Sequence, residues 1–564
     1  MKFSEYKYER IDLEQVGKQF SDLLDELEKQ TTAEGFYEVF LKIQEIEKHV
    51  YTMATLAQVR HSINTKDEFY EAENDFWDEA GPQLGVYENR LAKICLAFPD
   101  REALKKYIPE TVFLSAEYSL KTFDEKIIPL LQQENKLASE YGKLKATAQI
   151  EFDGKTYNLA SIGPLTLSKD RDVRRRAYDA KMDFYKKNQD QFDRIYDDLV
   201  KVRTQIAHEL GFKTYTELGY YRMDRFDYNQ EMVANYRKQI LEDIVPLTRE
   251  IYSRQSKRLG LDKLEYYDMG YEFESGNPTP KGSPDDLVQA AVKMYHEMSP
   301  QTGEFIDVMY NNELWDLVSK DGKQMGGYST GIPEYGVPFI FSNFNGTSGD
   351  VDVLTHEAGH AFQYYCSRNI PILNCQWPTM ESAEIDSMSM EFFAYPWMEN
   401  FFKEDTQKYY FSHFCGTLTF LPYGVLVDHF QHEVYNHPEM TIAERKACWR
   451  KLEKMYCPDR NFDGCDILEE GCWWYQQGHI FESPFYYIDY TLAQVCALQF
   501  WVRAHHNDPD YWQDYLNLCA AGGTETFTKL VKIAGLKVPF EEGCLKEVVK
   551  EARTFLNSFD DSQF

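Results

Sequence analysis

The sequence has no long run of apolar residues and few positive charges for its size. No stretch approaches the ~18 to 20 apolar residues that a membrane-spanning helix needs, so we expect no membrane partner. Lysine and arginine total 61 against 92 aspartates and glutamates, which gives a net charge of −31 over 564 residues. Because so acidic a surface repels a phosphate backbone, the composition argues against a nucleic-acid partner.

Paired cysteine motifs are also missing. The eleven cysteines lie between Cys95 and Cys544 without a Cys-x-x-Cys pair, and their odd number leaves at least one unpaired in any set of internal disulfides. Residues 1–7 are charged where a secretory signal needs an apolar stretch. We therefore expect a soluble, cytoplasmic protein with reduced thiols.

In much of the sequence, apolar and charged residues alternate at helical spacing. One apolar stripe at helical spacing consists of Leu13, Val16, Phe20, Leu23 and Leu27. A hairpin interrupts the pattern where the turn pair Asp153-Gly154 separates two short strand-like runs. The basic run at residues 174–176 lies among acids in a helical stretch, so we expect a solvated face there. The sequence predicts a mainly α fold with a small β element.

The motif that carries chemistry is His356-Glu357-Ala358-Gly359-His360. The apolar spacing around it is helical, and residues four apart on a helix point only ~40° from each other. Two imidazoles can therefore reach one zinc ion. Glu357, on the shoulder of the same face, can take a proton from zinc-bound water without binding the metal. The spacing predicts a catalytic zinc site.

A third protein ligand must come from elsewhere, because catalytic zinc takes three protein ligands and keeps a fourth position open. The best source downstream is the helical pattern at residues 381–393, where Glu381, Glu384 and Glu391 lie on one stripe. Spacing alone does not choose among these three acids.

These motifs, with the tyrosine-rich stretch that begins at His479, resemble the thimet oligopeptidase and oligoendopeptidase F family of zinc metallopeptidases. The resemblance implies Glu384 as the third ligand, with Glu391 supporting the site by hydrogen bonding. Residues 385–387 depart from the thimet pattern and favour the oligoendopeptidase F branch, which includes enzymes resembling PZ-peptidase.

The resemblance also implies catalytic roles for residues outside the zinc motif. His479, Tyr487 and Tyr490 would face the metal and donate hydrogen bonds to the oxyanion that develops during the reaction. The choice among Tyr486, Tyr487 and Tyr490 stays open.

A second region upstream of the motif can hold substrate. Residues 326–329 predict a glycine-bearing loop, and residues 337–344 predict a short strand. An exposed strand edge beside zinc could pair with an extended peptide, although a buried structural strand fits the pattern equally well.

Together these features predict a zinc metallo-oligoendopeptidase that hydrolyses internal bonds of short peptides and binds one zinc ion per chain. The family resemblance implies a two-lobed helical bowl enclosing a channel, with an N-terminal helical portion at 1–190 and a catalytic portion at 191–564. A zinc carboxypeptidase is the main alternative. A zinc-containing peptide-binding scaffold and a zinc hydrolase of non-peptide amides are less favoured.

Overall fold

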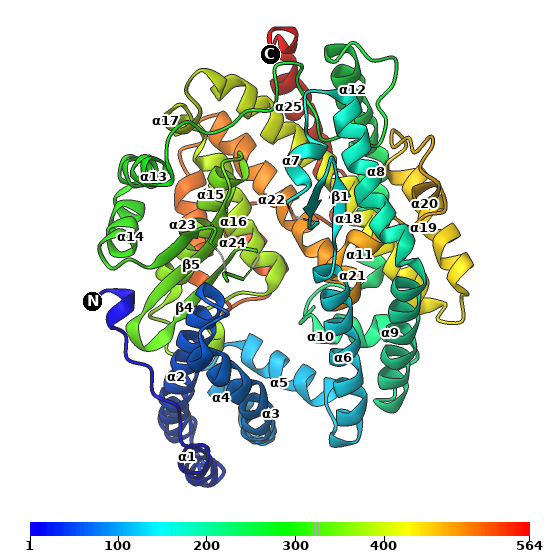
Figure 1. Cartoon of the computed structure of the whole chain (residues 1–564). Helices are drawn as coiled ribbons and strands as arrows, with labels where there is room; N and C mark the ends of the chain where they lie inside the picture. Colours follow the sequence, from blue (N-terminus) through cyan, green and yellow to red (C-terminus); the bar gives the residue numbers. More distant parts are fainter. Residues whose placement is uncertain (160, 321, 325) are drawn as a thin grey trace. The chain divides into compact units, whose positions relative to one another are not determined.

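The chain folds mainly into helices, which confirms the predicted fold class (Figure 1). The computed structural model describes residues 1–159, 161–320, 322–324 and 326–564. Within these ranges, no helix combines the length and the apolar character needed to cross a membrane.

Two compact units make up the chain, and each combines three separate segments. The first unit consists of Met1–Leu120, Thr279–Thr406 and Cys496–Val538. The second unit consists of Lys121–Pro278, Gln407–Val495 and Pro539–Phe564. The predicted boundary near residue 190 divides the chain into two consecutive portions. The compact units are built from separate segments of the chain and do not test this division, so the boundary stays a prediction.

The first unit holds the zinc motif. Its main helices and strands are α1 (Leu13–Leu27), α2 (Ala33–Ile63), α3 (Glu68–Ala97), α4 (Arg101–Leu104), α5 (Glu110–Thr122), α13 (Pro284–Met298), α14 (Pro300–Asn311), β3 (Trp315–Val318), β4 (Tyr328–Ile332), β5 (Val337–Phe344), α15 (Gly349–Ser367), α16 (Met380–Phe393), α17 (Glu399–Phe402), α23 (Tyr511–Ala521) and α24 (Phe527–Ile533).

A three-stranded sheet lies against the zinc-motif helix in this unit. Its order is β3-β5-β4, with β5 parallel to β3 and antiparallel to β4. Nearly every residue of β5 is buried, which explains its apolar run from residue 337 to residue 341. Helix α15 packs on β5 and β4 on one side and on α16 on another (Figure 1). The predicted β element near the zinc helix is confirmed, and β4 forms an edge of the sheet.

Local sequence signals produce the expected elements. In α1, the side chain of Asp12 accepts hydrogen bonds from the first-turn amides, and Val16, Phe20 and Leu27 are buried. The hairpin forms in the second unit, where Asp153 and Gly154 adopt φ angles of 46° and 77°. Positive φ at both turn residues matches the right-handed twist of the flanking strands.

The second unit is helical apart from this hairpin in the part of the chain that is described. Its main elements are α6 (Ile128–Ala146), β1 (Ile150–Phe152), β2 (Lys155–Tyr157), α7 (Gly163–Thr166), α8 (Arg171–Lys187), α9 (Gln189–Glu209), α10 (Tyr215–Arg222), α11 (Gln230–Gln239), α12 (Val245–Arg258), α18 (Thr406–Asn436), α19 (Ile442–Tyr456), α20 (Asp466–Glu469), α21 (Gly478–Glu482), α22 (Tyr487–His505, which continues into the first unit) and α25 (Cys544–Asn557).

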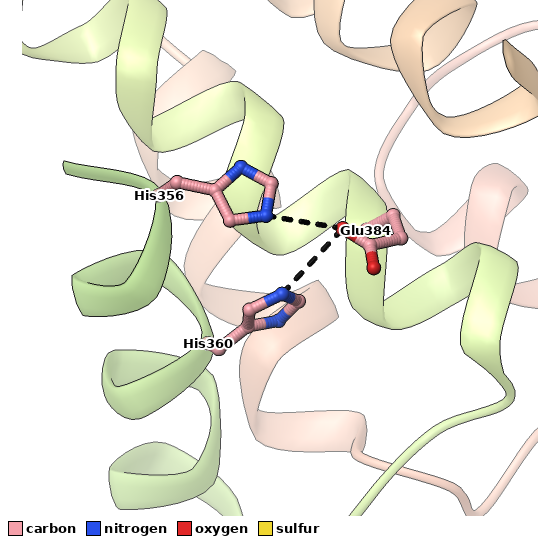
Figure 2. Close-up of side chains that lie close together, drawn as sticks. All are labelled: His356, His360 and Glu384. Atoms are coloured by element: carbon pink, nitrogen blue, oxygen red, sulfur yellow. Dashed lines mark ion pairs between the residues drawn. The ribbon is translucent and has the colours of Figure 1, made fainter. Parts of the chain in front are cut away.

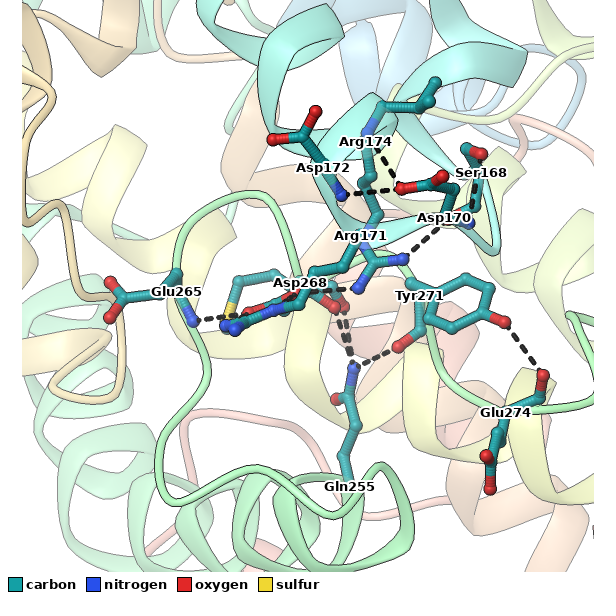
Figure 3. A network of polar contacts seen from close by, with 12 residues as sticks. Ser168, Asp170, Arg171, Asp172, Arg174, Gln255, Glu265, Asp268, Tyr271 and Glu274 are labelled. Atoms are coloured by element: carbon teal, nitrogen blue, oxygen red, sulfur yellow. Dashed lines mark hydrogen bonds and ion pairs between the residues drawn. The ribbon is translucent and has the colours of Figure 1, made fainter.

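A buried carboxylate fixes the loop after α12 to the start of α8 (Figure 3). Asp268 is fully buried and pairs with Arg171 at 2.6 Å and with Arg174 at 2.8 Å. The amide of Gln255 donates to the carbonyl oxygens of Asp268 and Tyr271 at 3.2 and 3.0 Å. The solvated face expected at residues 174–176 is therefore wrong for Arg174, which is 2% exposed because it neutralises Asp268.

Candidate metal centre

A glycine inside the motif lets the two helices of the site approach each other closely. A Cβ added to Gly359 on α15 would lie 2.6 Å from the Cα of Ser387 and 2.8 Å from the carbonyl oxygen of Asp386, both on α16. No side chain fits there. The small residue between the two histidines therefore sets the distance between α15 and α16.

This contact places His356 and His360 opposite Glu384 (Figure 2). The Nε2 atoms of the two histidines lie 3.3 and 3.5 Å from Oε2 of Glu384. Two ligands on a tetrahedral zinc ion, each bound at ~2.0 to 2.1 Å, are themselves about 3.4 Å apart. All three ligand atoms fall within 4.8 Å of one another. Both the donor types and their spacing fit a zinc ion.

A second acid on α16 orients the first histidine. Oε1 of Glu391 lies 2.6 Å from Nδ1 of His356, on the opposite side of the ring from Glu384. A proton on Nδ1 shared with Glu391 leaves Nε2 free to bind a metal. Burial opposes the charged form of His356, but hydrogen bonds and charges from Glu384 and Glu391 outweigh it and raise the pKa of His356 well above its usual value.

Of the three acids that the sequence left open, Glu384 is the one that joins the histidines in a ligand group within the described residues. Its side chain is 4% exposed, and the hydroxyl of Ser387 donates to it at 3.0 Å. Burial by itself raises the pKa of Glu384. The charge of His360 and hydrogen bonds from both histidines outweigh burial and hold the pKa of Glu384 well below its usual range. Glu391 binds the other nitrogen of His356, and Glu381 lies outside the group.

The predicted base, Glu357, is buried beside the start of β4. Burial raises the pKa of its carboxyl group. Its Oε2 atom is buried without a hydrogen-bond partner among the described residues. Its Oε1 atom lies 3.6 Å from where a Cβ on Gly327 would be. An added Cβ would therefore meet the carboxylate at ordinary van der Waals distance, which places Gly327 directly beside Glu357. The sequence predicted a glycine-bearing loop at residues 326–329 but not this contact.

His479 and the three tyrosines form one cluster in the second unit. The ring of His479 lies 5.0 Å from that of Tyr487 and 5.8 Å from that of Tyr490, and Tyr486 lies 4.9 Å from Tyr490. Burial raises the pKa of Tyr487 to about 12, so its hydroxyl keeps its proton at neutral pH. The amide of Gln477 lies 2.8 Å from Nδ1 of His479. The action of these groups on the metal stays a prediction.

Comparisons with known proteins agree with the sequence motifs. Residues 165–550 match the profile of peptidase family M3, and residues 3–123 match that of the peptidase M3 N-terminal domain. The oligoendopeptidase F homolog of Borreliella burgdorferi is 22% identical, covering 94% of this chain and 89% of that protein.

Solved structures give the same result over the full length. The structure of PZ peptidase A with an inhibitor is 50% identical with a TM-score of 0.94, and the match covers 100% of both chains. A Bacillus anthracis protein provisionally named oligoendopeptidase F is 48% identical with a TM-score of 0.90, covering 100% of this chain and 99% of that one. The chain therefore belongs to peptidase family M3 and is a metalloendopeptidase of the oligopeptidase type.

Proposed function

We propose that the metal is zinc, one ion per chain, held by His356, His360 and Glu384, and that the enzyme hydrolyses internal bonds of short peptides. The observation that carries this proposal is the 3.3 and 3.5 Å spacing between the histidine nitrogens and the Glu384 oxygen, which suits a tetrahedral ion. When bound, zinc would polarise the scissile carbonyl and lower the pKa of a water molecule.

Glu357 acts as the general base in this proposal. Its buried carboxylate has a raised pKa, which brings it closer to the range in which a base both accepts and returns a proton near neutral pH. It takes a proton from the attacking water and delivers it to the leaving amine. Glu391 holds His356 in the tautomer that presents Nε2 to the metal. No covalent acyl-enzyme is required.

Substrate contacts come from two further groups. The edge strand β4 would offer backbone groups to an extended peptide, and Gly327, just before this strand, lies next to Glu357. His479, Tyr487 and Tyr490 donate hydrogen bonds to the developing oxyanion. Their mutual packing supports this role, because rings held together can act on one atom.

Restricted access to the metal site, which the family resemblance implies, would favour short peptides over folded proteins. We place the enzyme in the cytoplasm. No disulfide joins the cysteines in the part of the chain that is described, which fits a reducing compartment.

One experiment tests the reaction and its base together. Glu357→Gln should keep stoichiometric zinc and lose several orders of magnitude in kcat on a blocked ten-residue peptide, since it removes the base but neither histidine. Glu381→Gln on α16 is the matched control and should retain activity. Mass spectrometry of the products should show internal cleavage. An intact blocked peptide, together with trimming of the same peptide carrying a free C-terminus, would instead favour the carboxypeptidase. Full activity in Glu357→Gln would refute the assigned base.

A further inference from the structure

We propose that Arg203 and Arg225 are positioning residues that hold the segment 478–490, and thereby His479 and Tyr490, in the geometry needed for catalysis. This inference rests on the proposed function, because it assumes that the rings of the segment act on the transition state. All of its contacts lie within the second unit.

The backbone of this segment changes direction between α21 and α22. The short helix α21 therefore ends in carbonyl groups that its own amides do not reach. Such carbonyls have no partner within the helix and need another donor. Arg203 donates to the carbonyl oxygens of Ile480 and Phe481, at 3.5 and 2.5 Å. Arg225 donates to the carbonyl oxygen of Phe485. The two arginines therefore bind the segment on both sides of the turn.

Arg203 is itself immobilised. It is 1% exposed, and its guanidinium also donates to Glu134 at 2.7 Å and to the hydroxyl of Tyr435 at 2.8 Å. Glu134 is shared with Arg222 at 3.1 Å. Burial raises the pKa of Glu134, but the charges of the two arginines outweigh it and lower the value, so the acid stays ionised. The planar fork of Arg203 is thus fixed by one acid and one phenol while it holds two carbonyl oxygens.

Arg225 closes the other side of the turn. It is 3% exposed and pairs with Asp489 at 3.0 Å, where both side chains are fully buried. One Nη2 group thereby joins the carbonyl of Phe485 to the carboxylate of Asp489, four residues later in the first turn of α22. The guanidinium also lies 4.7 Å from the ring of Tyr220. The residues between Phe485 and Asp489 include two of the three candidate tyrosines.

The turn is in a conformation that needs such support. Phe485 has a φ of 68°, a left-handed value that is unfavourable for a bulky residue. Its amide donates to Gln431 at 2.9 Å, and its ring fills space that a Cβ on Gly219 would occupy, 2.5 Å from Cδ2. The backbone shape of the turn is therefore imposed by its surroundings, with Arg225 supplying the charged contact.

The turn sets where the rings point. His479 precedes the carbonyls that Arg203 holds. Tyr486 and Tyr490 each directly follow a residue that Arg225 contacts. A displacement of about 1 Å in a catalytic group can lower a rate by on the order of 100-fold. Lysine, with a single ammonium group, cannot reproduce a fork that bridges two acceptors.

Arg203→Lys and Arg225→Lys test the proposal in the zinc-loaded, full-length enzyme. We expect each to lower kcat by on the order of 10- to 100-fold, with KM and zinc content changed less than about threefold. Amide hydrogen exchange should accelerate in residues 478–490 and stay unchanged in other helices of the unit. Arg194→Lys, an exposed arginine on the same helix as Arg203, should match the wild type in every measurement. Wild-type exchange in residues 478–490 in both variants would overturn the proposal.

A double-mutant cycle with Tyr490→Phe separates positioning from general stability. If Arg225 acts through the tyrosines, Arg225→Lys should cost far less in the Tyr490→Phe background than in the wild type. Additive losses would overturn the proposal. If Arg225→Lys does not fold, Asp489→Asn replaces it in the cycle and keeps an acceptor for Arg225. Wild-type kcat in Tyr490→Phe and His479→Ala would contradict the proposed function, while hydrogen exchange would still decide whether the arginines hold the segment.

Discussion

Replacing Glu391 should weaken zinc binding without removing a zinc ligand. The carboxylate lies 2.6 Å from Nδ1 of His356, a distance typical of a charge-assisted hydrogen bond. Glu391→Gln keeps an acceptor but loses the charge. Because bonds to charged groups contribute about 1 to 1.5 kcal/mol more than neutral ones, we expect a loss of roughly 5- to 13-fold in affinity.

Glu391→Ala removes the acceptor entirely. The imidazole then loses both its orientation and the partner that raises its basicity, so the loss should reach about 30- to 100-fold. Competition titration with a chromophoric chelator at fixed pH measures both dissociation constants. Thermal unfolding of each zinc-loaded variant shows whether the fold is intact.

Glu381→Gln provides the control, since it changes a buried acid on the same helix that lies outside the ligand group. Its zinc affinity should equal that of the wild type. The reasoning would be refuted if Glu391→Ala bound zinc like the wild type, or if Glu381→Gln lost as much affinity as Glu391→Ala.

Four further changes probe the site and the fold. Tyr490→Phe should lower kcat more than it raises KM, because the lost hydrogen bond forms mainly to the transition state; an effect on KM alone would make Tyr490 a binding or packing residue. Gly359→Ala should destabilise the protein by about 1 to 3 kcal/mol and weaken zinc binding, because the new Cβ meets α16 backbone; unchanged denaturant midpoint and affinity would contradict this. Asp268→Ala should lower the free energy of unfolding, measured in urea, by about 3 to 5 kcal/mol, because the buried Arg174 loses its acidic partner. A loss below about 1 kcal/mol would contradict that role of Asp268. Burial and the charge of Glu88 raise the pKa of Glu47 to about 8. The folded protein therefore keeps a proton that the unfolded chain releases, and stability should fall between about pH 4.5 and 8 by up to about 1.4 kcal/mol per unit. Glu47→Gln should flatten that profile, whereas an unchanged slope would contradict the assignment.

The sequence predicted the parts of the site that depend on one helix. His356, Glu357 and His360 have a fixed relation in any α-helix, so their spacing alone indicated a shared metal. The third position could not be chosen in this way, because Glu381, Glu384 and Glu391 share one helical stripe. Which acid faces the histidines depends on how α15 and α16 pack, and this contact is determined by the close approach at Gly359.

Contacts between distant residues explain what the sequence did not reveal. Arg174 belongs to a basic run that resembles a solvated face, but its partner Asp268 is 94 residues away. Arg203 and Arg225 hold carbonyl oxygens about 260 to 278 residues later, and backbone acceptors leave no pattern of residue types. Local signals were more informative: the Asp153-Gly154 pair predicted a hairpin because its turn needs positive φ at both residues.

The most direct test of the metal site is anomalous X-ray diffraction at the zinc edge from crystals of the purified enzyme. The proposed site predicts one strong peak per chain, at about 2.0 to 2.2 Å from Nε2 of His356, Nε2 of His360 and a carboxylate oxygen of Glu384. A zinc peak bound by Glu381 or Glu391 in place of Glu384, or one away from both histidines, would contradict it.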